Sequence, residues 1–468
     1  MKTRMHPSII LERLVNSLLV IIVLAFYIVT QMLDDFSAEN INNTISVISS
    51  LGFSTFTLGF IVIVLLLIVF GIFFFIAWKN TYLFFDNENL IIEKGKIFKQ
   101  VTTIHLSDIA TINITRNILE KILGTSNLKI DLNTSNSVTF KGKLVFKEDK
   151  AYELKNEILL RMGKDAGNKE EDFDSLIDYS SQDVFRHMLL SIDIVAILFI
   201  IIVYFIVLMG MMETSQTAGV IFTIIPILII IVPLLWSVAK TYLSYFNFKA
   251  IRENNQIRLS YGALTTYKYN LPISKINAVI IRQTLQARIL GYYNFEVVNA
   301  GISEQEEEKT IISLYIKSHN VNKVLEELIP EYQNTIVLQN QPKRALGHYL
   351  VAKILWIAIS LVLIPFTNYF SLLLIPLIVL IALAQYKTKQ IGKDDNLIII
   401  ADGILNKKVT LIKYSNIELV AIKQKLFSPI FGTKVLKINV VGPATNSSFE
   451  SGLFDKNVVM DIAKQYQE

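Results

Sequence analysis

Six long apolar runs are separated by polar stretches in which apolar and polar residues often alternate. The runs cover residues 14–33, 56–78, 188–210, 219–238, 349–366 and 368–384. Each is long enough for a helix that crosses the roughly 30 Å hydrocarbon core of a bilayer. None of them carries a charge at its centre; Lys353 lies near the end of its run, where its side chain can reach the interface. The pattern therefore predicts six transmembrane helices.

The apolar runs are grouped in pairs, and the linkers inside the pairs contain no lysine or arginine. These linkers are 34–55, 211–219 and 367–369. All basic residues therefore lie on one side of a six-span arrangement, and cytoplasmic loops are the ones enriched in Lys and Arg. We expect three helical hairpins, with both termini and all large polar segments in the cytoplasm.

The polar segment after each pair has the pattern of a β-rich unit that ends in a helix. In the first segment, residues 90–92, 101–106 and 137–146 alternate or are β-branched, and 147–162 have apolar positions at helical spacing. We predict five to seven antiparallel strands for each unit. An amphipathic C-terminal helix would cover the open end of such a curved sheet or small barrel.

The three β-rich units are copies of one another. Two glycines recur at a constant spacing, and a serine and an isoleucine recur between them. These repeat positions are Gly95, Ser107, Ile109 and Gly124; Gly262, Ser274, Ile276 and Gly291; and Gly403, Ser415, Ile417 and Gly432. A glycine after an alternating run indicates a turn that needs positive φ or a close approach of the backbone. The second glycine closes passages such as "ILG" at 122–124.

The six apolar runs and the three copies of the β-rich unit together divide the chain into eight segments. They are an N-terminal segment with hairpin 1 (1–79), unit 1 (80–163), an acidic linker (164–187), hairpin 2 (188–239), unit 2 (240–335), a linker (336–348), hairpin 3 (349–385) and unit 3 (386–468).

Composition agrees with a chain that is partly membrane and partly globular. The 468 residues are 52% hydrophobic, and the mean hydropathy is +0.46. There are 45 basic and 40 acidic residues, for a net charge of +5, which is too balanced for a nucleic-acid binder. The absence of cysteine excludes disulfides, thiol nucleophiles and cysteine-type zinc sites.

Candidate chemistry is sparse. The five histidines show no metal-ligand spacing, and the phosphate-loop, dinucleotide and nucleophile-elbow motifs are all missing. The acidic pairs Asp34–Asp35 and Asp394–Asp395 are most simply solvated turns. We predict that the chain is not an enzyme and that it uses no catalytic residues, cofactor or metal.

Two lysine clusters are candidate contacts for anionic lipid headgroups. Lys94, Lys96 and Lys99 flank Gly95, and Lys407, Lys408 and Lys413 follow Gly403. A cation near an anionic bilayer surface gains about 1 kcal/mol. The alternative is a solvated loop with the usual cytoplasmic excess of basic residues. The second copy has only Lys268 in this region, which weakens the idea of a shared lipid site.

The paired glycines, the Ser-x-Ile step and the "ILG" passage, alternating with pairs of spans, resemble the bacterial pleckstrin-homology (PH)-like domain. In particular they resemble the membrane family of YdbS/YdbT-type proteins, in which such domains occur in tandem. The resemblance covers nearly the whole chain, although the third copy departs from it at Pro429 and Phe431. It implies an α+β membrane protein with six transmembrane helices in three hairpins. These alternate with three PH-like β-sandwich or barrel domains, and the repeat positions have structural roles.

The function expected from this layout is that of a scaffold in a bacterial cell membrane. Its cytoplasmic PH-like domains would bind partner proteins, copies of itself or lipid headgroups. The family resemblance further implies envelope defence, including resistance to membrane-active peptides such as bacteriocins, and a smaller companion with one PH-like domain. The alternative is a transporter or export component for a hydrophobic or peptide substrate. Although none of the spans has a carboxylate or arginine at its centre, as a coupled transporter would, this alternative stays open.

Overall fold

The chain forms two compact units. A computed structural model describes residues 2–34, 55–95, 99–132, 143–163, 179–194, 197–198, 200–202, 204–205, 231–299, 310–366, 369–442 and 448–466. The first unit comprises Met1–Ile130 and Phe140–Glu171, and the second comprises Asp131–Thr139 and Asp172–Glu468.

Three helices among the described residues are long and apolar enough to cross a membrane: Phe60–Lys79, Lys343–Val362 and Phe370–Thr388. They correspond to the second, fifth and sixth apolar runs. The first run lies in a longer helix, α1 (Ser8–Asp34). The third and fourth runs fall largely outside the described residues, although a helix covers 231–244. Six spans in three hairpins therefore stay a prediction.

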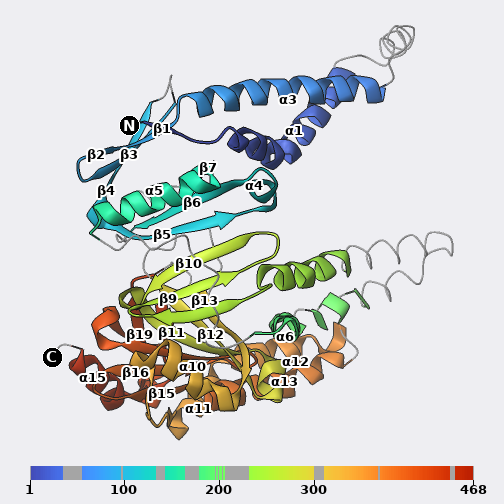
Figure 1. Cartoon of the computed structure of the whole chain (residues 1–468). Coiled ribbons are helices and arrows are strands. Elements are labelled where there is room, and N and C mark those ends of the chain that lie inside the picture. The colour runs from blue at the N-terminus through green and yellow to red at the C-terminus, as the bar shows by residue number, and fades with distance from the viewer. Residues whose placement is uncertain are drawn as a thin grey trace. The chain divides into compact units, whose positions relative to one another are not determined.

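In the first unit, two long helices lead into two small sheets. Helix α1 packs along α3 (Thr55–Lys79), and the Trp78 Nε1–H donates a 2.8 Å hydrogen bond to the Met5 carbonyl (Figure 1). The first sheet has the order β1-β2-β3-β4, with strands Thr3–Arg4, Tyr82–Asp86, Asn89–Lys94 and Gln100–His105. The next strands, β5 (Ile109–Arg116), β6 (Thr125–Leu132) and β7 (Val145–Lys147), lie in that order beside one another, and α5 (Glu148–Arg161) follows them.

The second repeat copies this plan within the second unit. Its first sheet contains β8 (Lys249–Glu253), β9 (Gln256–Tyr261) and β10 (Thr266–Pro272). Its second set contains β11 (Ile276–Gln283), β12 (Tyr292–Asn299) and β13 (Thr310–Lys317). Helix α10 (Val321–Leu328) closes the repeat by burying Val324, Leu325 and Leu328.

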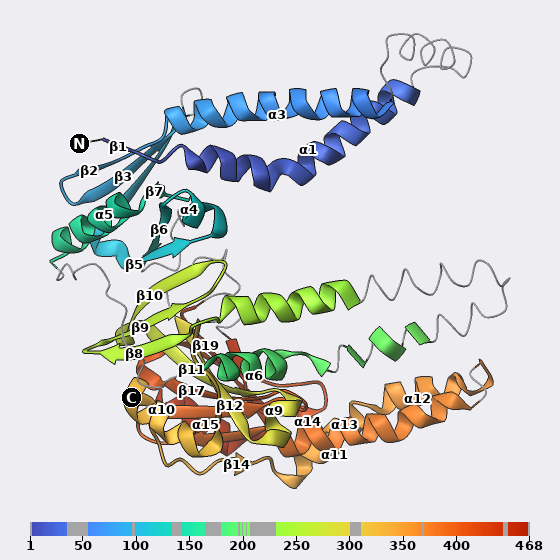
Figure 2. The ribbon, with the colours of Figure 1, turned by 45° about the vertical axis from the view of Figure 1, so that its right-hand side comes forward.

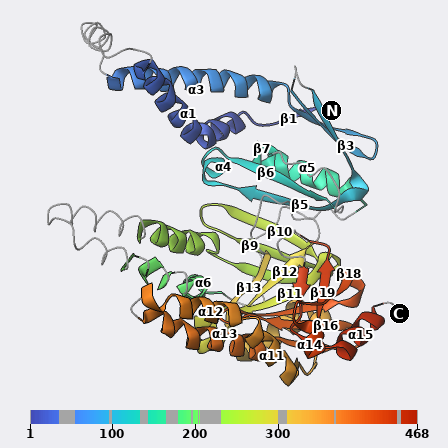
Figure 3. The same cartoon turned by 180° about the vertical axis from the view of Figure 1, so that it is seen from behind.

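The third repeat has the same elements. Strands β15 (Gln390–Lys393), β16 (Leu397–Asp402) and β17 (Lys407–Lys413) form its first sheet, and β14 (Gln339–Asn340) pairs with β15 as β1 pairs with β2. Its second sheet consists of β18 (Ile417–Lys423), β19 (Thr433–Val440), β20 (Ser448–Glu450) and β21 (Phe454–Asp455) (Figure 3). Helix α15 (Lys456–Gln465) closes the repeat with Val459 and Ile462.

The second and third repeats share one seven-stranded sheet, because β11 pairs antiparallel with β17. The strand order is β13-β12-β11-β17-β16-β15-β14. One face of this sheet packs into the core that contains Phe295, Leu328 and Tyr332. The other face packs into a second core with Leu436 and Ile462.

Burial on both faces accounts for the continuous apolar run of β16. Leu397 and Ile399 belong to the first core, whereas Ile398 and Ile400 belong to the second. In β19, by contrast, buried and partly exposed residues alternate over much of the strand. A strand covered on both sides needs apolar residues at every position, and a strand covered on one side needs them at every second position.

All six repeat glycines have positive φ, between 63° and 107°. They fall into two classes. A Cβ at Gly262 would lie 1.9 Å from the Thr265 carbonyl oxygen, and a Cβ at Gly403 would lie 1.9 Å from the Asn406 carbonyl oxygen. Around Gly124 and Gly291 a Cβ would meet no atom within 4 Å. The first class therefore excludes any side chain, whereas the second needs only the left-handed conformation.

We expect Gly403→Ala to lower the free energy of unfolding by about 2 kcal/mol or more, because the new methyl group meets backbone in a strained conformation. The matched control Gly291→Asn should cost less than about 1 kcal/mol, because asparagine tolerates the left-handed region. The measurement is thermal unfolding of the full-length protein in detergent. Equal losses for the two variants would contradict this account of the glycines.

Candidate functional site

A short helix lies between the first two strands of the second sheet in every repeat. These helices are α4 (Ile118–Ile122), α9 (Leu285–Leu290) and α14 (Ser428–Phe431). Each is followed closely by the second repeat glycine, which has positive φ. Together with their flanking residues, they form three equivalent segments, 117–124, 284–291 and 425–432, which we call the base turns.

Polar side chains fold the first two base turns locally. The Asn117 side chain accepts a 2.8 Å hydrogen bond from the Glu120 N–H, and the Glu120 carboxylate accepts one from the Asn117 N–H, which makes a capping box. In the second turn, Thr284 Oγ1 accepts a hydrogen bond from the Ala287 N–H.

The first base turn contacts the start of the first apolar run. Asn117 Nδ2 donates a 2.6 Å hydrogen bond to Glu12 Oε1, just before the run begins at residue 14. Glu12 is buried and also forms an ion pair with Lys143. The turn thus fixes the point at which α1 leaves the β-rich part of the unit.

The second base turn contacts the start of the third apolar run in the same way. Thr284 Oγ1 donates a 2.6 Å hydrogen bond to the Leu190 carbonyl, and Gln286 Nε2 donates a 3.1 Å hydrogen bond to the same oxygen. Leu190 lies at the end of α6 (Ser181–Ser191), where the apolar run 188–210 begins.

The third base turn packs against α11 (Lys343–Val351), where the fifth apolar run begins. The Phe431 ring covers Gly347 so closely that an added Cβ would lie 2.6 Å from its Cε1 atom. The centroid of the His348 ring lies 6.1 Å from that of Phe431. Every repeat therefore places its base turn against the first helix of its own predicted hairpin.

The base turns expose large apolar side chains at one equivalent position. Ile122 is 74% exposed, Ile289 76% and Ile430 75%. The apolar neighbours Leu123, Leu290 and Leu426 are also exposed, and the basic residues Lys121, Arg288 and Lys425 belong to the same turns. Figure 2 shows α9 and α14 beside the ends of the helices that carry the apolar runs of the second unit.

Other repeat positions have consistent structural places. Ser107, Ser274 and Ser415 lie exposed in short 3-10 turns, at Leu106–Asp108, Ile273–Lys275 and Tyr414–Asn416. The isoleucines that follow, Ile109, Ile276 and Ile417, are buried and begin β5, β11 and β18. None of the twelve repeat positions forms a polar cluster with another.

The structure does not bring the first lysine cluster together into one described site. Lys99 forms a 3.2 Å ion pair with Glu93, and burial, ahead of the nearby Arg13, lowers the pKa of Lys94. Lys96 lies outside the described residues.

The third-repeat lysines divide between two places. Lys407 and Lys408 pair across the shared sheet with Gln283 and Arg282, close to the second base turn. Burial, ahead of Arg288 for the first and Arg282 for the second, lowers the pKa of both ammonium groups. Lys413 lies 4.7 Å from the centroid of the Tyr332 ring, in a cation–π contact.

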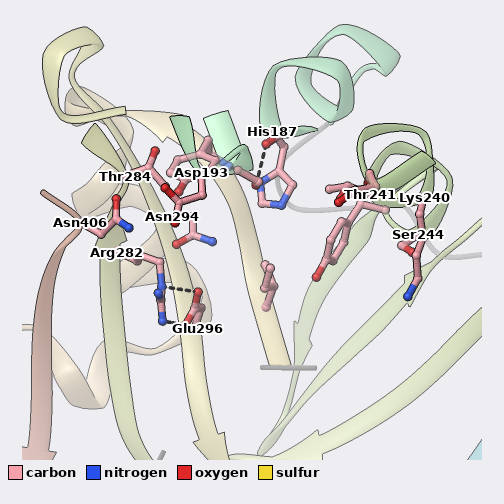
Figure 4. A pocket seen from close by; sticks show the side chains of 15 residues that line it. His187, Asp193, Lys240, Thr241, Ser244, Arg282, Thr284, Asn294, Glu296 and Asn406 are labelled. Carbon is pink, nitrogen blue, oxygen red and sulfur yellow. Dashed lines mark hydrogen bonds and ion pairs between the residues drawn. The ribbon is translucent and has the colours of Figure 1, made fainter. Parts of the chain in front are cut away.

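A polar pocket of about 490 Å³ lies behind the second base turn (Figure 4). Its wall includes residues of α6, the helix over 231–244, β11, β12 and β13, and Asn406 from the turn before β17. The residues that carry its polar character are Ser191, Asp193, Ser237, Lys240, Thr241, Ser244, Arg282, Thr284, Asn294 and Glu296.

Within the pocket, one ion pair is internally compensated. Arg282 Nε lies 2.6 Å from Glu296 Oε1, and Arg282 Nη2 donates a 2.8 Å hydrogen bond to Glu296 Oε2. Among the described residues, Lys240 has no carboxylate within ion-pair distance, and the buried Asn294 Oδ1 accepts no hydrogen bond. The wall thus offers a cation and a neutral acceptor to a polar ligand.

His187 joins the pocket wall as a neutral side chain. Its Nδ1 accepts a 3.3 Å hydrogen bond from the Tyr315 N–H, so the ring proton belongs on Nε2. The Tyr245 and Tyr315 rings lie 4.9 Å and 5.2 Å from it, centroid to centroid. Complete burial lowers the pKa of His187 to about 3. The imidazole therefore holds α6 against β13 and is a poor general base at neutral pH.

The arrangement offers polar side chains to a ligand. Over the described ranges, no group of three His, Asp or Glu side chains is placed to hold a metal ion. In this pocket the Glu296 carboxylate is paired with Arg282, and the imidazole acceptor of His187 is used by the backbone.

Sequence comparison decides the family. The bacterial PH domain family matches residues 17–162, 191–331 and 347–468, which are the three repeats with their preceding apolar segments. The chain belongs to the bacterial PH domain family. The predicted resemblance is thereby confirmed, and the three matches agree with the internal repeat.

A curated relative of the bacterial PH domain protein is similar over part of its length. The chain is 26% identical over 161 residues to the UPF0699 transmembrane protein YdbT of Bacillus subtilis (strain 168). The match covers 33% of this chain and 32% of that relative, so it spans about a third of each. Together with the three long apolar helices, this relationship identifies a membrane protein with PH-like domains.

Sequence reasoning found the base turns as a recurring passage but missed what they do. The constant position of Ile122, Ile289 and Ile430 before a glycine was a readable signal, because an exposed apolar residue in a turn is unusual. The pocket gave no such signal, since Lys240, Asn294 and Asn406 are far apart in the sequence.

We expect the bacterial PH domain protein to lose stability as the pH falls below about 6.5, in part through His187. The histidine binds a proton in the unfolded chain but not in the fold, so unfolding is favoured between its two pKa values. At pH 5 the free energy of unfolding should be about 2 kcal/mol lower than at neutral pH because of this histidine. Thermal unfolding should show a shallower decline between pH 7 and pH 5 for His187→Gln, despite its lower melting temperature at pH 7. Parallel pH profiles would disprove this assignment.

Proposed function

We propose that this protein is a membrane scaffold whose base turns rest on the cytoplasmic surface of the bilayer. Its PH-like repeats would hold lipid headgroups and partner proteins at that surface, in defence of the envelope against membrane-active peptides. A smaller companion with one PH-like domain stays a predicted partner.

One observation carries the membrane-surface part of the proposal. Three isoleucines at the same repeat position are 74–76% exposed, and each belongs to a turn that contacts the start of an apolar run. A side chain of this size gains about 1.5–3 kcal/mol when it leaves water. Basic neighbours such as Lys121 and Arg288 add attraction to anionic headgroups.

The shared sheet supports a scaffold in preference to a set of loosely linked domains. Because β11 and β17 pair directly, the second and third repeats cannot move independently without exposing two cores. The apolar helices of these two repeats leave the unit on the same side (Figures 1 and 2). A rigid body held in this way presents its base turns at one level.

The pocket behind the second base turn suits the polar head of a phospholipid. Lys240 lies in the helix over 231–244, which continues the fourth apolar run, and Thr284 belongs to the base turn itself. A ligand with an anionic head and apolar tails would place the head beside Lys240 and the tails along the helix. Because Arg282 is already compensated by Glu296, Lys240 is the cation that an added phosphate would meet.

The depth of the base turns can be measured directly, because the chain contains no cysteine. We expect a polarity-sensitive fluorophore on Ile289→Cys, in nanodiscs of phosphatidylglycerol and phosphatidylethanolamine, to report an apolar environment and to be quenched by nitroxide lipids. The control is Met460→Cys on α15, which lies away from the apolar helices in Figures 1 and 3. If the fluorophore at residue 289 reports the same polar environment as the control, the surface contact is refuted.

The defence role predicts a phenotype. A strain that lacks the gene should become several-fold more sensitive to pore-forming peptides, and the wild-type gene should restore resistance. A copy with Lys240→Gln, tested for equal membrane abundance, should restore it only in part if the pocket serves the same role. Unchanged sensitivity on deletion would remove the defence function and leave the surface contact standing.

A further inference from the structure

We infer that copies of this protein associate head to tail by strand addition, with β18 of one copy pairing with β4 of a second copy. The inference rests on strand edges and not on the lipid contacts proposed above. Its starting point is the pairing that already joins two repeats inside the second unit.

That internal pairing shows how two successive repeats join: an edge strand of one repeat pairs with an edge strand of the next. The first strand of the second set in repeat 2, β11, pairs with the last strand of the first sheet in repeat 3, β17. The paired residues are Ala278 with Ile412, Val279 with Leu411, Ile280 with Thr410, Ile281 with Val409, Arg282 with Lys408, and Gln283 with Lys407. Each side chain of the pair Ile281–Val409 is partly buried against the first core.

Strand β18 is the equivalent of β11 in the third repeat. Both strands follow a 3-10 turn, begin with a buried isoleucine and carry a register shift at the same place, between Ile276 and Ala278 and between Ile417 and Leu419. Strand β11 is almost fully buried, whereas Leu419 is 47% and Ile422 is 40% exposed. Within the described residues, β18 pairs only with β19, so its other edge is open.

Strand β4 is the equivalent of β17 in the first repeat. It ends the order β1-β2-β3-β4, and in the described part of the chain it pairs only with β3. Val101, the equivalent of Val409, is 49% exposed. In the described part of the chain, the first repeat therefore leaves the edge of β4 unpaired and the last repeat leaves the edge of β18 unpaired.

Transferring the internal register to these edges gives a specific set of pairs. Counted from the repeat glycines, they are Leu419 with Ile104, Val420 with Thr103, Ala421 with Thr102, Ile422 with Val101, Lys423 with Gln100, and Gln424 with Lys99. None of these pairs places like charges opposite each other. On the β4 side, four of the six paired residues are β-branched, which favours strand pairing: Val101, Thr102, Thr103 and Ile104.

The open edge of β18 carries no proline. Its two charged residues, Glu418 and Lys423, and its register shift lie toward the ends of the strand, which leaves Leu419 to Ile422 uncharged and regularly paired with β19. Because the two edges differ, the contact is head to tail. Such contacts produce rings or open chains, in contrast to the closed dimer that a self-paired edge would give.

The test uses separately tagged full-length copies in native membranes, with single cysteines in a chain that otherwise has none. Ile422→Cys in one copy and Val101→Cys in the other should form a mixed disulfide on mild oxidation, because directly opposite residues bring their Cβ atoms within about 5.5 Å. The matched control pairs Ile422→Cys with His105→Cys, four residues out of register, and should give at least tenfold less product.

Each other result overturns the inference. No cross-link at residues 422 and 101 argues against pairing in the membrane. Product formed mainly between two copies of Ile422→Cys indicates a self-paired edge, and equal product with the His105→Cys control indicates random collision. Melting temperatures of the single variants, which alter exposed positions, show whether each is folded.

A charge exchange checks the same contact without oxidation. We expect detergent-solubilised wild type to form higher oligomers in light scattering, and Ile422→Glu should abolish them. Mixing Ile422→Glu with Val101→Lys should restore them, because opposite charges then face each other across the edge. Oligomers unaffected by Ile422→Glu would place the contact between copies elsewhere.

Discussion

The second unit depends on the pairing of β11 with β17. Six residue pairs along this seam convert two small sheets into one sheet of seven strands. Each face of the sheet then closes a different core, one with Phe295 and Leu328 and the other with Leu436 and Ile462. Breaking the seam would open both cores at once, so the two repeats are stable together in a way that neither would be alone.

The base turns connect each repeat to its own apolar helix. In each repeat a short helix ends near a glycine with positive φ and contacts the residues at which an apolar run begins. The partners differ, since Asn117 meets a carboxylate, Thr284 meets a backbone carbonyl and Phe431 meets a glycine. The position of the base turn is the same in all three repeats, whereas the contacting groups differ. The shared feature is therefore the attachment of the helix to the sheet and not one particular interaction.

A polar pocket lies where these two features meet. The pocket behind the second base turn is lined by the helix over 231–244, by strands of the second repeat and by Asn406 of the third. Its charges are mostly compensated, apart from Lys240, and its histidine is kept neutral by burial. Such a wall presents hydrogen-bonding groups to a polar ligand, and its imidazole is a poor proton acceptor at neutral pH.

Local sequence pattern determined the repeat, the positive-φ glycines and three of the apolar helices. Hydrophobic period and steric exclusion act over a few residues, so Gly95, Gly262 and Gly403 could be read as turns without knowing their neighbours. The comparison with known families confirmed the repeat. The continuous apolar run of β16 was readable as a buried strand, but its two-sided environment was not.

Only the tertiary structure decided which strand edges meet and which side chains share a pocket. The register between Ile281 and Val409, and the shared pocket that Lys240 and Asn294 line, join residues whose separation along the chain carries no periodic signal. A strand edge offers the same N–H and C=O groups to any partner, so sequence alone cannot choose between them. The choice is made by the burial of side chains on both faces once the sheet is assembled.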